Sequence, residues 1–250
     1  IICSDGNQQV AFRLDNVEYT IEITNNEYSI IEAMNTNSIV NIVSSNGNKY
    51  VFNDGSSYNA NKKFSLTNGT YTFKNIPDTH PMAILNSGKE TNIAYEASNN
   101  PIIIKVSGGQ FSAPYYTFKD EQENNINIYT GAFKFMRGKT YKFQADGISS
   151  THPFKIVYNK GTQSTPSISG SSGSFTVTMT SDDDNNSYYQ CVRHSTMKSN
   201  IQFLYGTVDS IDYNFYYGDI DVTVSGDFSE VSVYCLYHGY MGGENLLIYN

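Results

Sequence analysis

Two sequence patterns each occur twice in this chain of 250 residues, and they restrict its fold more than any other feature. The first reads Thr-Tyr-x-Phe and, after a variable loop, Thr-His-Pro-x-x-Ile; it covers residues 70–84 and 140–156. The second reads Cys-x-x-His-x-x-Met and covers residues 191–197 and 235–241. Internal duplication of one structural module is the simplest explanation of the two pairs.

The residues around these patterns favour strands over helices. Charged residues make up only 16% of the chain, whereas 21 Tyr and 14 Phe, which are common in strands, are present. Residues 17–23 alternate apolar Val, Tyr and Ile with polar Glu and Thr, which is typical of a half-buried strand. The sequence therefore predicts an all-β protein, with extra strands in the N-terminal region.

Charge and hydropathy limit the kinds of partner. The net charge of −8 argues against a nucleic-acid partner, and no apolar stretch approaches the length of a membrane span. The chain opens with Ile1-Ile2-Cys3, which predicts a mature product, a proteolytic fragment or part of a longer protein. The odd total of three Cys does not suggest a disulfide framework, so we expect Cys3 to be free or paired upstream.

The order of the patterns predicts that one module is inserted into the other. Two modules in series would alternate the two patterns, but here both His-Pro patterns come first. The separation of His152 and Cys191 suits one module, whereas His80 and Cys235 lie too far apart for one. The alternative is a crossed arrangement in which His80 joins residues 191–197. We therefore predict an outer domain of residues 48–113 and 207–250, an inner domain of residues 114–206, and N-terminal strands or the end of a preceding domain in residues 1–47.

The repeated patterns contain all four His residues and two of the three Cys residues of the chain. Imidazole and thiolate ligands together suit copper, and two His with one Cys and a weak Met are typical of electron-transfer copper sites. We therefore predict two mononuclear copper sites. The inner set consists of His152, Cys191, His194 and Met197, and the outer set of His80, Cys235, His238 and Met241.

These ligand sets resemble those of the cupredoxins, the β-sandwich blue-copper proteins. The resemblance covers residues 48–250, implies a Greek-key β-sandwich for each module, and extends to cupredoxin-like modules of viral and environmental proteins. Pro81 and Pro153 follow the first His where the family often has Asn, and a proline has no N–H to donate to the Cys sulfur. The inner loop also lacks the Gly-Gly that follows Met241, so we expect the inner site to be the weaker one.

Three alternatives to bound copper are left open by the sequence. A duplicated sandwich can keep its ligand residues as a structural module without metal. Zinc accepts the same His and Cys ligands, although Met is a poor zinc ligand. A disulfide between Cys191 and Cys235 would require the two loops to touch, with Cα atoms within about 7 Å of each other.

The small number of His residues argues against an enzyme. A multicopper oxidase or a copper nitrite reductase needs further His ligands, and no nucleophile, phosphate-loop or dinucleotide pattern is present. We expect a copper-binding protein that exchanges single electrons with a redox partner or is stabilised by its copper. The alternative is a structural or interaction protein of a virion or an extracellular appendage, whose partner would be a self-assembly partner. Both functions suit an extracellular, periplasmic or virion-surface location.

Overall fold

A computed structural model of the chain describes residues 8–14, 17–24, 27–180 and 186–250. Within these ranges the chain forms strands joined by turns and loops, and it contains no helix. The all-β prediction is therefore confirmed. In this part of the chain, no helix has the length and apolar character needed to cross a lipid bilayer. Cys3, predicted to be free or paired upstream, lies outside the described residues.

The described residues form two compact units, and the second unit interrupts the first in the sequence. The first unit contains the residues up to Glu96 and residues 206–250, and the second contains residues 97–205. The second unit thus begins before the predicted start at residue 114. The reason is strand β11 (Ile102–Gly108), which pairs with β12 (Tyr116–Lys119) and β14 (Thr140–Ile148) of the second unit. The Greek-key topology of each unit stays a prediction.

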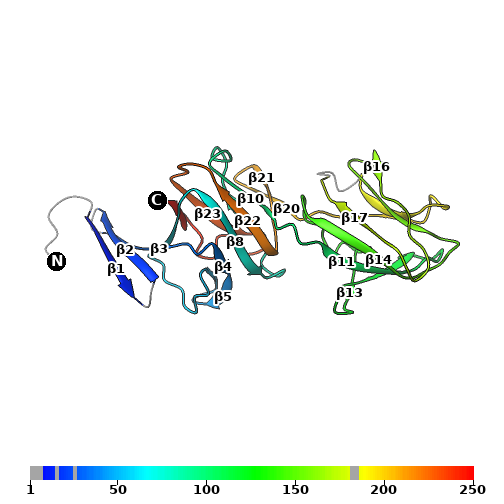
Figure 1. Ribbon diagram of the computed structural model, residues 1–250, viewed down its shortest axis with the longest axis horizontal. Coiled ribbons are helices and arrows are strands. Elements are labelled where there is room, and N and C mark those ends of the chain that lie inside the picture. The colour runs from blue at the N-terminus through cyan, green and yellow to red at the C-terminus, as the bar shows by residue number, and fades with distance from the viewer. Residues whose placement is uncertain (1–7, 15–16, 25–26, 181–185) are drawn as a thin grey trace. The chain divides into compact units, whose positions relative to one another are not determined.

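The second unit consists of two sheets (Figure 1). The larger sheet has the strand order β13–β12–β11–β14–β17, and the smaller has the order β16–β15–β18–β19. Neighbouring strands are antiparallel except β11 and β14, which are parallel. The remaining bounds are β13 (Asn125–Ile126), β15 (Phe154–Tyr158), β16 (Gln163–Ser164), β17 (Ser174–Thr178), β18 (Tyr188–Cys191) and β19 (Lys198–Asn200).

Aromatic side chains join the two sheets of the second unit. Phe154 of β15 is fully buried, and its ring lies 5.6 Å from that of Phe143 and 5.1 Å from that of Tyr116. Phe118 of β12 lies 5.1 Å from Tyr189 of β18. Because each aromatic side chain buries a large apolar area, these contacts between β12, β14, β15 and β18 form the core of a sandwich.

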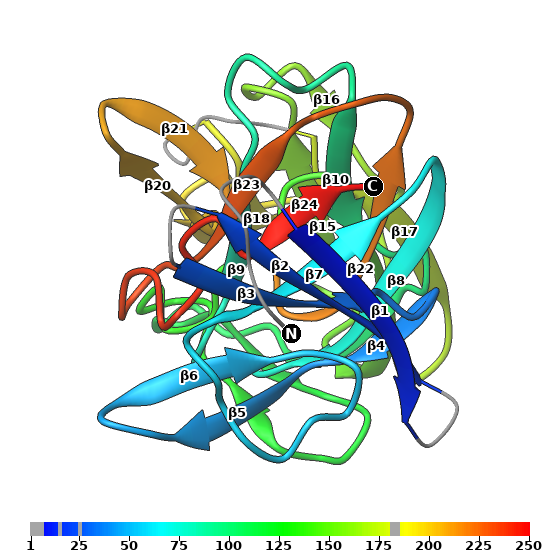
Figure 2. The ribbon, with the colours of Figure 1, turned by 90° about the vertical axis from the view of Figure 1, so that its left-hand side faces the viewer.

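The first unit also contains two main sheets (Figure 2). Their strand orders are β1–β2–β3–β7–β24–β23–β9 and β10–β22–β8–β4, and β5–β6 and β20–β21 form separate hairpins. Phe52 joins the main sheets because its ring lies 5.5 Å from Phe64 and 4.9 Å from Phe73. The bounds are β1 (Gln8–Leu14), β2 (Val17–Thr24), β3 (Glu27–Ala33), β4 (Asn37–Ile39), β5 (Asn41–Ser44), β6 (Asn48–Val51), β7 (Lys62–Leu66), β8 (Gly69–Ile76), β9 (Met82–Leu85), β10 (Ile93–Ala97), β20 (Tyr205–Val208), β21 (Ile211–Asn214), β22 (Gly218–Val224), β23 (Glu230–Cys235) and β24 (Leu247–Tyr249).

The two units share a set of strand pairings. Strand β8 pairs antiparallel with β22 and parallel with β4, and β14 pairs antiparallel with β17 and parallel with β11. Strand β9 pairs antiparallel with β23, as β15 does with β18. Each Thr-Tyr-x-Phe pattern lies on β8 or β14, and each Cys-x-x-His-x-x-Met pattern begins at the last residue of β18 or β23. The sequence repeat therefore corresponds to a repeat of the structure.

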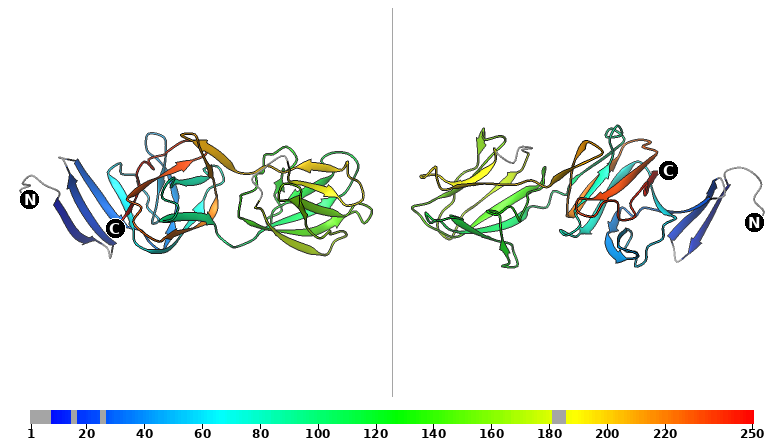
Figure 3. Two further views of the ribbon diagram at one scale, coloured as in Figure 1. Left: turned by 90° about the horizontal axis from the view of Figure 1, so that it is seen from above. Right: turned by 180° about the vertical axis from the view of Figure 1, so that it is seen from behind.

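Strands β1 to β3 extend the larger sheet of the first unit at one edge (Figure 3). Strand β3 pairs parallel with β7, and β4 pairs parallel with β8. The buried Glu32 forms an ion pair with Lys62 and accepts a hydrogen bond of 2.6 Å from Asn53. The N-terminal strands are therefore present, but β3 and β4 belong to the sheets of the first unit and not to a separate preceding domain.

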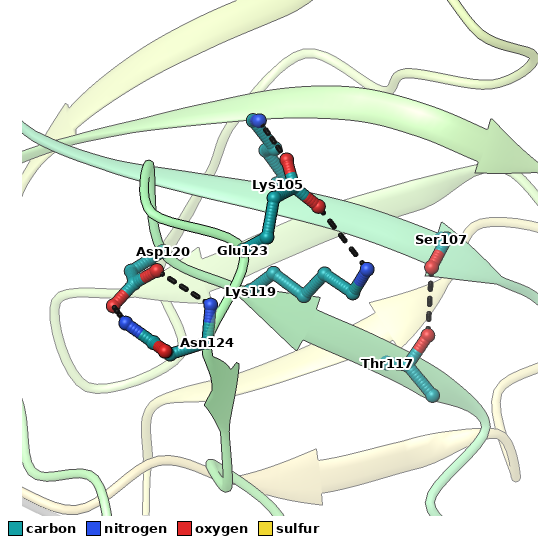
Figure 4. A network of polar contacts seen from close by, with 7 residues as sticks. All are labelled: Lys105, Ser107, Thr117, Lys119, Asp120, Glu123 and Asn124. Atoms are coloured by element: carbon teal, nitrogen blue, oxygen red, sulfur yellow. Dashed lines mark hydrogen bonds and ion pairs between the residues drawn. The ribbon is translucent and has the colours of Figure 1, made fainter.

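The outward face of β11 and β12 carries charged side chains (Figure 4). Glu123 accepts a hydrogen bond from Lys105 and another, at 3.1 Å, from Lys119. Because side chains alternate between the faces of a strand, the adjoining Val106 and Phe118 are buried in the core. Exposed ion pairs contribute little to stability, so the buried face holds this sheet in place.

Replacement of Phe154 by Ala should lower the free energy of unfolding of the second unit by about 3–5 kcal/mol, because it leaves a cavity between the sheets. Urea denaturation followed by near-ultraviolet circular dichroism measures the change. Phe111→Ala is a matched control, since Phe111 is 66% exposed and its loss should change that free energy by less than about 0.5 kcal/mol. Equal effects of the two changes would contradict the position of Phe154 in the core.

Candidate metal centres

The inner ligand residues lie at one end of the smaller sheet of the second unit. Strand β15 begins directly after His152 and Pro153, and β18 ends at Cys191. Phe154 and Cys191 are partners in the antiparallel pairing, and the N–H of Val192 donates to the Pro153 carbonyl at 2.9 Å. The strand pairing therefore places His152 beside Cys191, although the two residues are far apart in the sequence.

His152, Cys191 and His194 form a cluster that we call the inner triad. Cys191 Sγ lies 3.5 Å from His194 Nδ1 and 3.8 Å from His152 Nδ1, and the two Nδ1 atoms lie 3.0 Å apart. All three potential ligand atoms lie within 4.8 Å of one another. Two imidazoles and a thiol that converge in this way can hold one metal ion. Among the described residues, no other group of three His, Cys, Asp or Glu side chains has this geometry.

The inner triad is shielded from solvent except at His194. Cys191 is fully buried and His152 is 8% exposed, whereas His194 is half-buried. Met197, the predicted fourth ligand, is buried in the same core as Cys191. Its N–H donates to the His194 carbonyl at 3.1 Å, and its carbonyl accepts from the Cys191 N–H at 3.0 Å. The loop from Cys191 to Met197 therefore folds back on itself next to the triad.

An aromatic side chain from the loop after β11 covers the two histidines. The Phe111 ring lies edge-on to both, 4.7 Å from the His152 ring and 5.0 Å from the His194 ring. Gly109 allows the loop to approach, since it has φ of +93° and a Cβ there would lie 3.1 Å from His152 Cβ. Any other residue at Gly109 would have to displace His152, so this loop and the triad constrain each other.

The outer ligand residues lie at the matching place in the first unit but form a looser group. Cys235, the last residue of β23, pairs with Met82, which begins β9 just after His80 and Pro81. Cys235 Sγ lies 3.5 Å from His238 Nδ1, and the rings of His80 and His238 stack with their centroids 4.7 Å apart. Met241 is buried.

His80 contacts other partners instead of Cys235. Its Nδ1 lies 2.9 Å from Thr79 Oγ1, and its Nε2 lies 3.0 Å from Asn48 Nδ2. Among the described residues, no group like the inner triad includes His80. The inner ligand atoms therefore converge in this structure and the outer ones do not, which is the reverse of the expected order of the two sites. Which site binds a metal ion more strongly stays a prediction.

Two buried tyrosines contact the ligand residues, and neither repeated pattern contains them. The Tyr116 hydroxyl donates to the His152 carbonyl at 3.0 Å, and the Tyr50 hydroxyl donates to the His80 carbonyl at 2.8 Å. A third repeat, Tyr-x-Phe at residues 50–52 and 116–118, is the sequence signal that could have identified them. Phe111 and Gly109 have no such signal, since nothing matches them in the first unit's sequence.

Two arrangements left open by the sequence are wrong. In the crossed arrangement His80 would join residues 191–197, but His152 lies there. Cys191 and Cys235 are both free thiols, so they do not form a disulfide with each other. The choice between copper, zinc and a metal-free scaffold depends on the chemistry of the ligand set.

The pKa of His80 lies below its ordinary value, first because burial penalises the charged imidazolium and second because His238 lies beside it. Imidazole must be neutral to bind a metal, so this shift favours the form that can act as a ligand. In the metal-free protein, the midpoint of the His80 titration in imidazole NMR spectra should therefore lie below about pH 6.5.

His238→Gln should move the His80 midpoint upward by removing the neighbouring charge, but only in part, because burial remains. His194→Gln, in the other unit, is the matched control and should leave the His80 midpoint unchanged. A midpoint at or above the ordinary value in the unaltered protein would contradict the environment described for His80.

Comparison with known proteins does not place the chain in a family. No protein-family model, no curated protein and no solved structure matches it. The resemblance to cupredoxins stays a prediction from the residues, and a functional proposal has to rest on the geometry of the inner triad.

Proposed function

We propose that this protein binds copper at mononuclear sites and transfers single electrons, with the inner triad as its first site. The observation that carries the proposal is the convergence of His152 Nδ1, His194 Nδ1 and Cys191 Sγ within 4.8 Å of one another. Thiolate and thioether sulfur suit Cu(I), and imidazole also suits Cu(II). A mixed set with Met197 nearby therefore suits both oxidation states of one ion.

The same residues suit zinc less well. A structural zinc site uses four His or Cys ligands, and the inner triad supplies three. A catalytic zinc site keeps an open position for water. Here Cys191 is fully buried and the Phe111 ring covers both histidines. Within the described residues, no fourth His, Cys, Asp or Glu side chain joins the three.

The surrounding backbone holds the inner ligands in place, which favours rapid electron transfer. The His152 N–H donates to the Ser149 carbonyl at 3.0 Å, and the His152 carbonyl accepts from Tyr116. Cys191 is held by strand pairing on one side and by its own loop on the other. Copper, when bound, supplies the one-electron redox chemistry. The protein positions the ligands, excludes water from Cys191, and exposes His194 and Phe111 on the side where a redox partner can approach.

The outer residues are proposed as a second, weaker copper site. Cys235 and His238 are already in contact, and Met241 is buried in the same loop. Binding there requires His80 to leave Thr79 Oγ1, which opposes binding by the loss of a hydrogen bond, worth about 1 kcal/mol. Copper should therefore fill the inner site before the outer site.

An assembly role is the second candidate, and strand β1 favours it. Strand β1 is an edge strand of its sheet, and Val10, Phe12 and Leu14 on it are all exposed. An exposed apolar edge strand is a template for pairing with another chain. In such a protein, metal ions would serve to stabilise the sandwiches, because binding to the folded state adds to its stability.

Copper titration tests the proposal. A first equivalent of Cu(II) added to metal-stripped protein should produce an intense thiolate-to-copper charge-transfer band, and a second should bind more weakly. The measurement is the visible spectrum together with bound copper per chain. Cys191→Ala should remove the first phase of the titration, which is the tight binding of one copper equivalent with its charge-transfer band, because the inner thiolate is lost. Cys235→Ala, the matched control, should keep this first phase and remove the second, which is the weaker binding of the second equivalent.

Two outcomes would overturn parts of this proposal. If the unaltered protein takes up no copper and shows no band, the redox function is wrong and the assembly role becomes the better candidate. If Cys235→Ala removes the first phase and Cys191→Ala leaves it, copper binds but the inner triad is not its first site.

A further inference from the structure

A buried carboxylate in the first unit contacts both a lysine and an asparagine side chain. Glu32 lies on β3, and its side chain is 5% exposed. Its Oε2 forms an ion pair with Lys62 Nζ, and its Oε1 accepts a hydrogen bond of 2.6 Å from Asn53 Nδ2. An amine and a carboxamide therefore lie within reach of the same carboxylate, one at each of its oxygens.

The backbone places the lysine and the asparagine beside this carboxylate. Lys62 is the first residue of β7, and it lies opposite Ile30 in the parallel pairing of β7 with β3. Asn53 follows β6 with φ of +56°, a left-handed conformation that Asn adopts more readily than most residues. The Asn53 N–H donates to Oγ of the buried Ser38 at 2.8 Å. The positions of Lys62 and Asn53 therefore do not depend on their contacts with Glu32 alone.

The Asn53 carboxamide is bonded at both its oxygen and its nitrogen. Oδ1 accepts from the Asn35 N–H at 2.9 Å, and Nδ2 donates to Glu32 and, at 2.9 Å, to the Ala33 carbonyl. A backbone N–H bonded to a carbonyl oxygen stabilises the negative charge that develops there when a nucleophile adds to the carbon. The amide is thus held between a donor for this charge and a carboxylate that can exchange protons with its nitrogen.

Aromatic rings adjoin the Lys62 amine. Lys62 Nζ lies 5.0 Å from the centre of the buried Phe64 ring and 6.0 Å from that of the Tyr19 ring. By contrast, Glu123, an ion-pair partner on the surface of the second unit, has a side chain that is 52% exposed. Burial of Glu32 limits the access of water, which would otherwise compete with the amine for the amide carbon. The group around Glu32 therefore differs from an ordinary surface ion pair.

We propose that Lys62 and Asn53 form an intramolecular amide bond, with Glu32 as the acid–base group of the reaction. The Lys62 ammonium gives a proton to Glu32, and the neutral Nζ then adds to Asn53 Cγ. The oxyanion at Oδ1 accepts from the Asn35 N–H as the Cγ–Nδ2 bond breaks. Glu32 passes two of the three ammonium protons to Nδ2, which leaves as ammonium, and the third proton stays on the new amide. The carboxylate is restored, and the reaction needs no oxidant, metal or co-reactant.

The new bond closes the loop between β6 and β7 covalently. Strand β7 lies between β3 and β24 in the larger sheet of the first unit, so the bond fixes a central strand of that sheet. A covalent loop lowers the conformational entropy of the unfolded chain and thereby stabilises the folded one. This inference goes beyond the proposed copper function and does not rest on it.

The mass of the unaltered full chain tests the proposal. It should be lower than the mass calculated from the sequence by that of one ammonia molecule. After digestion with trypsin, residues 50–63 should form one peptide with the same loss, because trypsin does not cleave after an acylated lysine. The full calculated mass, together with cleavage after Lys62, would overturn the proposal.

An asparagine that cyclises onto its own backbone also loses ammonia, and the digest separates this reaction from the proposed one. Cyclisation leaves the Lys62 amine free, so trypsin cleaves after it. In the proposed product, a single backbone break between Asn53 and Lys62 releases no fragment, because the two residues remain joined. Loss of ammonia with a free Lys62 amine would therefore also overturn the proposal.

Variants of the lysine assign the nucleophile. Lys62→Arg keeps the positive charge and should have its full calculated mass, because a guanidinium does not attack the amide. Lys63→Arg is the matched control, since Lys63 is the next residue of β7 and forms its ion pair with Glu230 at 2.9 Å. This control should lose ammonia as the unaltered protein does. Loss of ammonia that persists in Lys62→Arg would exclude Lys62 as the nucleophile.

Variants of the other two residues assign the acceptor and the acid–base group. Asn53→Asp should lose water instead of ammonia and should give a product of the same mass as the unaltered protein; loss of ammonia from this variant would exclude Asn53. Glu32→Gln should have its full calculated mass, with its fold checked by far-ultraviolet circular dichroism. A complete bond in Glu32→Gln would overturn the role of Glu32. If Glu32→Gln does not fold, the masses of the unaltered protein and of Asn53→Asp still decide whether the bond forms.

Discussion

The pairing of the strand that follows the first histidine with the strand that ends at the cysteine is the constraint on which both sites depend. Phe154 pairs with Cys191, and Met82 pairs with Cys235, so each His-Pro turn lies beside a cysteine. A shift of this register by one residue would turn the cysteine to the opposite face of its sheet. The packing of Phe154 between the sheets opposes that shift. Core packing and ligand placement are therefore consequences of the same register.

Equal strand pairing does not make the two sites equal, because the loops around the first histidine differ. In the second unit, the loop with Gly109 and Phe111 packs directly on His152 and leaves its Nδ1 facing Cys191. In the first unit, Thr79 and Asn48 bind the two ring nitrogens of His80. The paired strands thus bring the backbones together, and the surrounding side chains decide whether the ligand atoms converge.

Much of the fold and of the ligand grouping could be predicted from the sequence, because both depend on repeated local patterns. The all-β class follows from composition and alternation, and the grouping of His152 with Cys191 follows from their separation along the chain. The start of the second unit could not be predicted, because the parallel pairing of β11 with β14 is non-local. The difference in how closely the two ligand groups converge could not be predicted either, because it involves side-chain contacts of His80 with Thr79 and Asn48. Tyr50 and Tyr116 form a short repeat that becomes significant only when their hydroxyls are seen beside the ligands.

The proline after each first histidine limits how the His-Pro turn bonds to its neighbours. A proline restricts its own φ and the conformation of the residue before it, and it has no N–H to donate. The His-Pro turn therefore contacts its neighbours through carbonyls: His152 accepts from Tyr116, and Pro153 accepts from Val192. In the first unit the same turn accepts from Tyr50 at the His80 carbonyl and from Leu236 at the Pro81 carbonyl. These carbonyl contacts tie the turn to the neighbouring strands β6 and β12 and to the residue after each cysteine, so the position of the first histidine depends on the same bonds that hold the fold together.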